Sequence, residues 1–169
     1  MKNEKYFYFV EGQCEQKLIN ELKSSEMLPP GRTVVFNVLT KKISKSRIMD
    51  ISKRSVVIMV FDTDACQEIT TLSNNVSLLK TQVEEVKVLY LIQVENLEDE
   101  LIRSTDIKKI EELTNSRSEK DFKSDFLKQR SCLPLLEKHH FDLRKIWITE
   151  PPRSFACFKQ GINELLSRC

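Results

Sequence analysis

Acidic residues follow directly after two of the most apolar segments of this chain. Glu11 and Gly12 come after one run of aromatic and aliphatic residues, and Asp62 and Asp64 come after a second run about 50 residues later. If both runs are parallel strands of one sheet, their carboxyl ends meet at the edge where open α/β sheets bind ligands. Two carboxylates about 5 Å apart repel by roughly 3 kcal/mol at an effective dielectric of about 20, so three of them need protons, basic partners or a divalent cation.

These carboxylates predict a site for a hard divalent cation. Ligands that are all oxygen favour Mg²⁺ or Mn²⁺, and a turn just beyond the strand can bring Asp62 and Asp64 toward one ion. Glu11 would bind the same ion or position a water as general base. Gly12 permits a tight turn and a close backbone approach to a phosphate at the N-terminus of the following helix. The alternative is that these acids only cap helices, which is common in strand-to-helix loops.

Short β-rich runs alternate with helical periodicity in the first half of the chain, a pattern typical of βαβ units. Four strands are predicted, at residues 6–10, 33–39, 55–61 and 86–92. The third lacks polar alternation, so it should be central and buried on both faces. We therefore predict an α/β fold with a four-stranded, mostly parallel sheet and helices on both faces.

Apolar residues at helical spacing separate these strands. One stripe lies between the first and second strands and another between the third and fourth, and each would cover a face of the sheet. The stripes are Cys14, Leu18, Ile19 and Leu22, and Ile69, Leu72, Val76, Leu79 and Val83. Ile48 and Ile51 indicate a shorter helix before the third strand. Two prolines and a glycine at residues 29–31 break the chain before the second strand.

From residue 95 onward the pattern becomes mainly helical. Apolar residues indicate successive short amphipathic helices within residues 97–127 and a closing helix over 155–166, while residues 145–149 predict a short extra strand. The chain is expected to consist of an α/β core, residues 1–94, and a helical extension, residues 95–169. A length of 169 residues suits one domain, so both parts should pack as one compact unit.

Two segments resemble the Toprim domain, which occurs in topoisomerases, bacterial primases, small maturation ribonucleases and the OLD-like and RloB-like nucleases of phage defence. The segments are F-V-E-G-Q-C-E at residues 9–15 and V-F-D-T-D at residues 60–64, and the resemblance covers about residues 6–92. It implies a Toprim-like, Rossmann-like sheet, with Glu11 as the acid/base glutamate and Asp62 and Asp64 as Mg²⁺ ligands. It also implies a nuclease with a role in phage defence.

A run of acidic residues follows the fourth predicted strand. Residues 93–100 (Q-V-E-N-L-E-D-E) resemble an acidic element that some defence-associated Toprim proteins carry there, which makes Glu98 a candidate for an additional metal ligand. An acidic first turn of a helix explains the run equally well. Large OLD-type proteins also contain an ATPase, but the sequence has no G-x-x-x-x-G-K-[ST] motif. An ATPase partner would therefore be a separate chain.

Two groups of lysines lie near the predicted site or on the helical extension. Lys41, Lys42 and Lys45 follow the second predicted strand, at the same sheet edge as the acids. Lysines beside a Mg²⁺ site would bind phosphates and attract a polyanion, although a solvated loop has the same composition. The second group alternates with acids, which indicates a salt-bridged solvent face rather than phosphate contacts. Its members are Lys120, Lys123 and Lys128.

Composition excludes several classes of protein. The 27 Lys and Arg residues against 25 Asp and Glu give a net charge of +2, which by itself favours neither nucleic acid nor a membrane surface. The sequence has no signal-peptide core and no apolar stretch of the roughly 20 residues that span a membrane, so we expect a cytoplasmic protein without membrane contact. The adjacent His139 and His140 point apart on a helix and make a poor ligand pair. The cysteines are scattered without a disulfide or zinc pattern, at Cys14, Cys66, Cys132, Cys157 and Cys169.

Together these patterns favour a Mg²⁺-dependent phosphodiester hydrolase that cuts DNA or RNA, with Glu11 activating water or protonating the leaving oxygen. The alternative is a non-catalytic Toprim-like partner or regulatory subunit of a separate ATPase or effector protein, since the helical half has no assigned role. A phospho-receiver domain would also place Asp62 after its third strand. That class fits poorly, because Glu11 and Gly12 stand where such domains carry an acidic pair.

Overall fold

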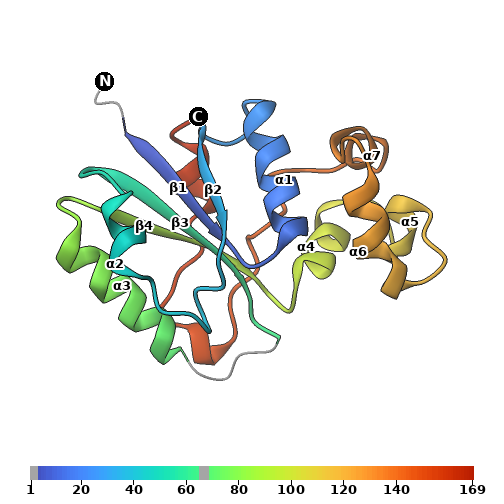
Figure 1. Ribbon diagram of the computed structural model, residues 1–169. Helices are drawn as coiled ribbons and strands as arrows, with labels where there is room; N and C mark the ends of the chain where they lie inside the picture. Colours follow the sequence, from blue (N-terminus) through green and yellow to red (C-terminus); the bar gives the residue numbers. More distant parts are fainter. Residues whose placement is uncertain (1–3, 65–68) are drawn as a thin grey trace.

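Four parallel strands form the centre of the computed structural model, which describes residues 4–64 and 69–169 (Figure 1). The strands are β1 (Lys5–Val10), β2 (Gly31–Val35), β3 (Ser55–Asp62) and β4 (Lys87–Gln93). They are arranged in the order β2-β1-β3-β4, so β1 and β3 are the two central strands. The predicted α/β class and parallel sheet are confirmed, and the arrangement is Rossmann-like.

Side chains alternate along each strand, so the sheet has two apolar faces, each covered by its own hydrophobic cluster. In β1, Tyr8 and Val10 join one cluster, while Phe7 and Phe9 join the other. The helices before β4 are α1 (Gln13–Ser24), α2 (Lys45–Met49) and α3 (Thr70–Gln82). Helix α1 packs on the first face, and α2 and α3 pack on the second. Strand β3 is buried on both faces over residues 55–61, as its apolar sequence predicts.

The two central strands continue into helices that cover opposite faces of the sheet. Helix α1 follows β1 and α3 follows β3, and β1 and β3 are neighbours in which Val10 pairs with Val60. Where neighbouring parallel strands send their connections to opposite faces, a crevice opens beyond their carboxyl ends. The residues after Val10 and those at the end of β3 therefore meet at this crevice.

Strand β2 is shorter at its carboxyl end than residues 33–39 predict. It ends at Val35, although the backbone N–H of Phe36 still donates to the carbonyl of Val10 at 2.7 Å. Asn37 then turns the chain, because its Oδ1 accepts hydrogen bonds from the backbone N–H groups of Leu39 and Thr40 at 2.9 and 3.1 Å. An asparagine that bonds to following backbone amides favours a turn over an apolar strand.

The secondary-structure elements that follow β4 in the second half of the chain are all short helices. Helices α4, α5, α6 and α7 gather beside α1 at one end of the sheet (Figure 1). The elements are α4 (Leu97–Ser104), α5 (Glu111–Thr114), α6 (Glu119–Lys128), α7 (Leu133–Lys138), the 3₁₀ helix η1 (Arg153–Phe155) and α8 (Ile162–Leu166). Apolar residues of α4, α6 and α8 belong to the same cluster that α1 forms with the sheet.

The predicted strand at residues 145–149 is wrong. Trp147, at the centre of this segment, has a φ of 56°, which a strand does not accommodate. Its backbone N–H donates instead to Glu100 Oε2 at 2.8 Å, and its side chain is fully buried. Burial of the indole and a hydrogen bond to a buried carboxylate fix this segment without any strand pairing.

The predicted closing helix over residues 155–166 is interrupted. Phe155 and Phe158 pack on the α3 face of the sheet, whereas Ile162 and Leu165 pack on the α1 face, so the chain between them passes over the edge of β4. Gln160 forms an isolated parallel bridge with Tyr90 there, and a continuous helix could not reach both faces.

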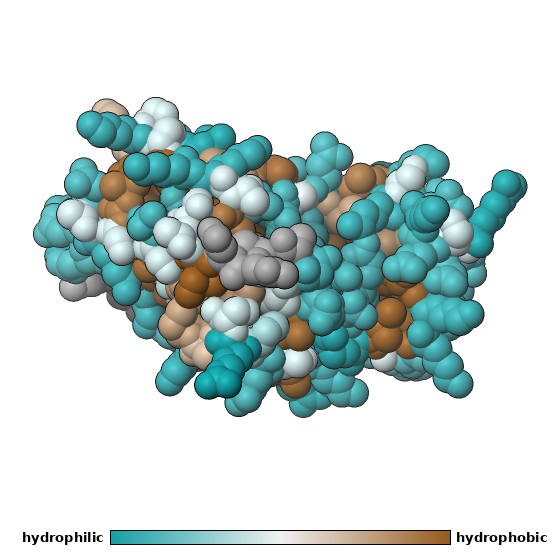
Figure 2. All heavy atoms as spheres, turned by 90° about the horizontal axis from the view of Figure 1, so that it is seen from below, coloured by the Kyte–Doolittle hydropathy of each residue, from teal (hydrophilic) through white to brown (hydrophobic). Residues whose placement is uncertain are grey.

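Hydrophilic side chains cover most of the face seen from below in Figure 2, and the apolar ones form several separate groups. Within the described residues, no helix combines the length and the apolar character that crossing a membrane requires.

Candidate functional site at the carboxyl edge of the sheet

Glu11 and Asp62 meet where β1 and β3 end. The backbone N–H of Asp62 donates to Glu11 Oε2 at 3.1 Å, and Asn37 Nδ2 donates to Glu11 Oε1 at 2.8 Å. Both oxygens of the Glu11 carboxylate are thus oriented, one from β3 and one from the turn after β2. Asn37 was not expected at the site from the sequence. The feature that could have indicated it is a polar residue directly after the apolar residues 34–36.

Asp62 is the most strongly perturbed acid at this edge. Its Oδ1 atom is buried and has no hydrogen-bond partner within the described residues. Burial raises the pKa of Asp62 to about 9, and neighbouring negative charges add to this effect. Those charges belong to Glu15, Glu11, Asp64 and Glu98. Without a cation, the Asp62 carboxyl therefore holds a proton at neutral pH.

Glu15, in the first turn of α1, is a further acid at this edge that the sequence did not single out. Its side chain is buried, and burial raises its pKa, as do the charges of Glu11 and Glu98. Gly12 makes room for it, since a Cβ atom on Gly12 would lie 2.8 Å from Glu15 Oε2. Gly12 precedes α1 in an extended conformation with a φ of −141°, which any residue can adopt, and the chain bends at residues 11 and 12. The glycine leaves space for the end of the Glu15 side chain.

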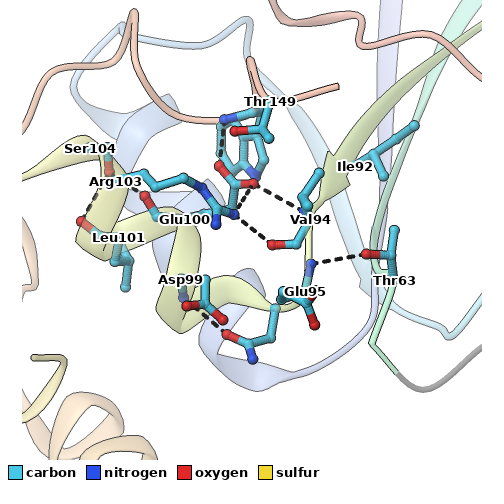
Figure 3. A network of polar contacts seen from close by, with 12 residues as sticks. Thr63, Ile92, Val94, Glu95, Asp99, Glu100, Leu101, Arg103, Ser104 and Thr149 are labelled. Carbon is cyan, nitrogen blue, oxygen red and sulfur yellow. Dashed lines mark hydrogen bonds and ion pairs between the residues drawn. The ribbon is translucent and has the colours of Figure 1, made fainter. Parts of the chain in front are cut away.

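Asp64 lies on a turn that is fastened to the loop between β4 and α4. The Thr63 and Asp64 backbone N–H groups both donate to the Glu95 carbonyl, at 3.0 and 3.1 Å, and the Glu95 N–H donates to Thr63 Oγ1 at 2.9 Å (Figure 3). Asp64 itself is exposed. The turn therefore has a fixed backbone, and it presents the Asp64 side chain at the surface.

Helix α4 brings Glu98 to this edge, where Glu98 forms an ion pair with a lysine. Lys123 Nζ of α6 lies 3.2 Å from Glu98 Oε1, and the Glu98 side chain is only 12% exposed. Burial lowers the pKa of Lys123, but the negative charges of Glu98, Glu15 and Asp62 outweigh this and raise it. The predicted salt-bridged solvent face is confirmed for Lys123, which is 63% exposed, and its ion-pair partner is an acid at the edge of the sheet.

A pocket of about 390 Å³ opens beside this ion pair. Acidic, basic and amide side chains line it, from the turn after β3, from the start of α4 and from α6. They are Asp64, Asn96, Glu98, Glu119, Lys120 and Lys123. Oxygen ligands and ammonium groups in one pocket suit a phosphate that shares a cation with the protein.

Lys41, Lys42 and Lys45 lie on the loop after β2 and the start of α2, and all three are exposed. Within residues 4–64 and 69–169, none of them forms an ion pair with the acids. The loop is positioned from α3 by the buried Asn75, whose Nδ2 donates to the carbonyls of Val38 and Lys41 and whose Oδ1 accepts from the Ile43 N–H. These lysines can attract a polyanion, whereas Lys123 is the lysine paired with a site carboxylate.

The donor atoms at this edge are of the kind that binds Mg²⁺, but the side chains are not arranged as a complete coordination site. Among the described residues, no group of three or more His, Cys, Asp or Glu side chains is arranged to hold a metal ion. The donors are nevertheless all oxygen, and the buried, unpartnered Asp62 Oδ1 is the kind of atom that a cation would satisfy. Repulsion among the carboxylates disfavours a closer arrangement without a cation.

Of the other chemically reactive side chains, Cys14 lies close to the acids, because it neighbours Glu15 and its Sγ donates to the carbonyl of Lys123 at 3.9 Å. His139 Nδ1 and His140 Nδ1 both contact the Asp106 carboxylate, at 3.2 and 2.6 Å, in an exposed cluster. Cys14 and Cys132 are buried, and burial raises the pKa of both thiols, to about 11 and about 12. Cys157 and Cys169 are exposed and free, and Cys66 lies outside the described residues.

Comparison of the chain with models of protein families, with curated proteins and with solved structures found no match. The geometry of the carboxylates and their partners is therefore what points to a function.

Proposed function

We propose that this protein is a Mg²⁺-dependent phosphodiester hydrolase whose active site is the acidic edge formed by Glu11, Asp62, Asp64 and Glu98. The observation that carries the proposal is the Asp62 carboxyl, with a buried and unpartnered Oδ1 beside four other acids at the crevice of a parallel sheet. A cluster of this kind costs stability unless a ligand uses it. A divalent cation bound by oxygen atoms, Mg²⁺ or Mn²⁺, is the ligand that it suits best.

Asp62 and Asp64 would hold the cation, with Glu98 as an additional ligand. When bound, such a cation polarises a phosphoryl oxygen and lowers the pKa of a coordinated water. Glu11 is held by Asn37 and by the backbone N–H of Asp62, so its carboxylate keeps one orientation. Each of its oxygens retains a second lone pair, which accepts a proton from the attacking water or returns one to the leaving oxygen.

Lys123 and Lys120 are the residues that we assign to the substrate phosphate. In the absence of ligands, Lys123 neutralises Glu98. When Glu98 turns to the cation, the Lys123 ammonium becomes free to pair with a phosphate oxygen in the adjoining pocket. Lys41, Lys42 and Lys45 would then contribute attraction at longer range, which depends on salt concentration.

The substrate and the cellular role that we propose are those that the resemblance to the Toprim domain implies. The positions of Glu11, Asp62 and Asp64 at neighbouring strand ends agree with the order of the Toprim motifs along the chain. On that basis we propose DNA or RNA as substrate, a cytoplasmic role in phage defence, and a separate ATPase or effector chain as a partner.

The test is a cleavage assay with labelled DNA and RNA, single- and double-stranded, in Mg²⁺ or Mn²⁺. We expect wild type to cut at least one of these substrates and EDTA to stop it. Glu11→Gln and Asp62→Asn should each reduce the rate by about 100-fold or more, since each removes a proton acceptor or a metal ligand. Glu137→Gln, at an exposed position of α7, is the matched control and should cut as wild type does.

Unchanged cleavage by the Glu11 and Asp62 variants would contradict the assignment. If wild type cuts none of these substrates, either alone or with a co-purified protein, and instead binds that protein tightly, the regulatory-subunit alternative replaces the hydrolase.

A further inference from the structure

Gln93, the last residue of β4, has a buried amide group without partners. Its side chain is 0% exposed, and neither its Oε1 nor its Nε2 atom has a hydrogen-bond partner within the described residues. Most buried amides are hydrogen-bonded, because an unsatisfied one costs free energy of folding. A buried amide without a hydrogen-bond partner at the end of a strand indicates that a ligand or a water binds there.

A second glutamine at the same strand shows the ordinary arrangement. Gln160 packs beside β4, where its Oε1 accepts from the Ile92 N–H at 2.9 Å and its Nε2 donates to the carbonyls of Ile92 and Thr149. Both polar atoms of the Gln160 side chain therefore form hydrogen bonds with the backbone of Ile92 or Thr149. Ile92 directly precedes Gln93, whose side-chain polar atoms form none within the described residues.

Gln93 is placed beside Asp62 by the register of the sheet. The two residues are partners in the parallel pairing of β3 and β4. Val60 in β3 and Leu91 in β4 both belong to the cluster on the α1 face, and side chains two residues apart on a strand point to the same side. Gln93 and Asp62 therefore project side by side toward α1, and both carry a buried oxygen without a partner.

We propose that Gln93 is a neutral ligand of the cation site, with its Oε1 coordinating the same ion as Asp62. The inference rests on the proposed function and extends it to a residue outside the acidic set. Amide oxygens are ordinary ligands of hard cations. The negative charges of four other acids already act on Asp62 at this edge, so a neutral oxygen adds a ligand without adding charge.

The test measures Mn²⁺ binding to the full chain by the electron paramagnetic resonance signal of free Mn²⁺, together with the melting temperature in EDTA. Gln93→Leu removes the oxygen and fills the space with an apolar group of similar size. We expect Mn²⁺ affinity to fall about tenfold or more, while the metal-free melting temperature rises by roughly 2–6 °C because a buried unsatisfied amide is gone.

Two variants separate ligation from packing. Gln93→Glu keeps an oxygen at the same distance from the backbone, so it should restore Mn²⁺ binding to within a few-fold of wild type. Gln160→Leu is the matched control, because it removes an amide whose partners are all present. It should lower the melting temperature and leave Mn²⁺ affinity unchanged, and Gln160→Glu replaces it if the leucine variant does not fold.

The failures of the inference and of the proposed function give different results. Mn²⁺ binding that requires Asp62 but is unchanged in Gln93→Leu would overturn the role of Gln93 alone. A lower melting temperature of Gln93→Leu with unchanged Mn²⁺ affinity would overturn it as well, since the amide would then be a structural group. If wild type and Asp62→Asn show the same Mn²⁺ titration, the cation site itself is wrong, and the role of Gln93 is rejected with it.

Discussion

The Asp62 carboxyl holds its proton more tightly than an exposed aspartate does, because burial removes water from its charged form and the nearby acids repel that form. The pKa of about 9 lies far above the ordinary value of 3.8. Folding without a cation therefore keeps a proton on Asp62 that the unfolded chain releases. Asp62, which makes the site suitable for a cation, thus also makes the metal-free protein less stable as pH rises.

We expect the free energy of unfolding of the metal-free protein to decrease from about pH 4 toward pH 9, because unfolding releases the Asp62 proton over this range. The contribution of the Asp62 proton to the free energy of unfolding is fully present below the unfolded pKa near 4. It is lost once the pH reaches the folded pKa near 9. Asp62→Asn should give a shallower decrease, with a remainder due to Glu15, whose pKa burial also raises. Urea unfolding in EDTA at pH 5, 7 and 9 measures these slopes.

The control for this series is Asp142→Asn. Arg144 lowers the pKa of the exposed Asp142 by hydrogen bonding, so this aspartate titrates only in acid. Its variant should therefore keep the wild-type slope between pH 5 and pH 9. An Asp62→Asn protein with that same slope would show that Asp62 is charged in the folded state.

At the scale of the element, α3 does more than cover the sheet. Asn75 in its middle is fully buried and forms three hydrogen bonds with the backbone of the loop after β2, at 2.8 to 2.9 Å. That loop begins at Asn37, which orients Glu11. A helix on one face of the sheet therefore positions, through one amide, the turn that completes the site at the strand ends.

Asn75→Ala should lower the free energy of unfolding by about 3 kcal/mol, because two carbonyls and one N–H of the loop lose buried partners. Urea unfolding measures this loss, and amide hydrogen exchange at Ile43 should become faster. Asn74→Ala changes the exposed neighbouring residue and should stay within about 0.5 kcal/mol of wild type. Equal stability of the two variants would show that the loop keeps its conformation without Asn75.

At the scale of the whole molecule, the helical extension and the α/β core share polar and apolar contacts. Glu21 of α1 accepts hydrogen bonds from the backbone N–H groups of Cys132 and Leu133, at 2.6 and 3.1 Å. The buried Glu100 of α4 accepts from the N–H groups of Val94 and Trp147 (Figure 3). These bonds join four segments of the chain, at residues 21, 94–100, 132–133 and 147.

We expect the chain to unfold in one cooperative transition. Trp147 is the only tryptophan, is fully buried and lies in the extension, so its fluorescence reports docking of that part. Circular dichroism reports the helices and strands of both parts. The two urea curves should coincide, and a fragment of residues 1–94 should show no cooperative transition, because it exposes the apolar face that the extension covers. Two separated transitions would show that core and extension fold independently.

The sequence alone determined the approximate positions of the four sheet strands, the class of fold and the edge at which the acids gather, but it also predicted a strand at residues 145–149 that does not form. An unbroken apolar run at β3 and helical stripes on either side require a buried parallel strand with helices over both faces, and these are local patterns. The positions of Glu11, Asp62 and Asp64 at strand ends follow from the same patterns. The sequence did not determine the end of β2, where Asn37 forms local hydrogen bonds within an apolar run.

Only the tertiary structure decided which other side chains reach this edge. Lys123, Glu15 and Gln93 are unremarkable in their local sequence, and they become neighbours of Asp62 through the packing of α6 on α1, the glycine before Glu15 and the pairing of β4 with β3. The physical reason is that periodicity reports burial along one element. Contacts between elements depend on how their faces fit together, and an unpartnered amide such as that of Gln93 is visible only when all of its neighbours are in place.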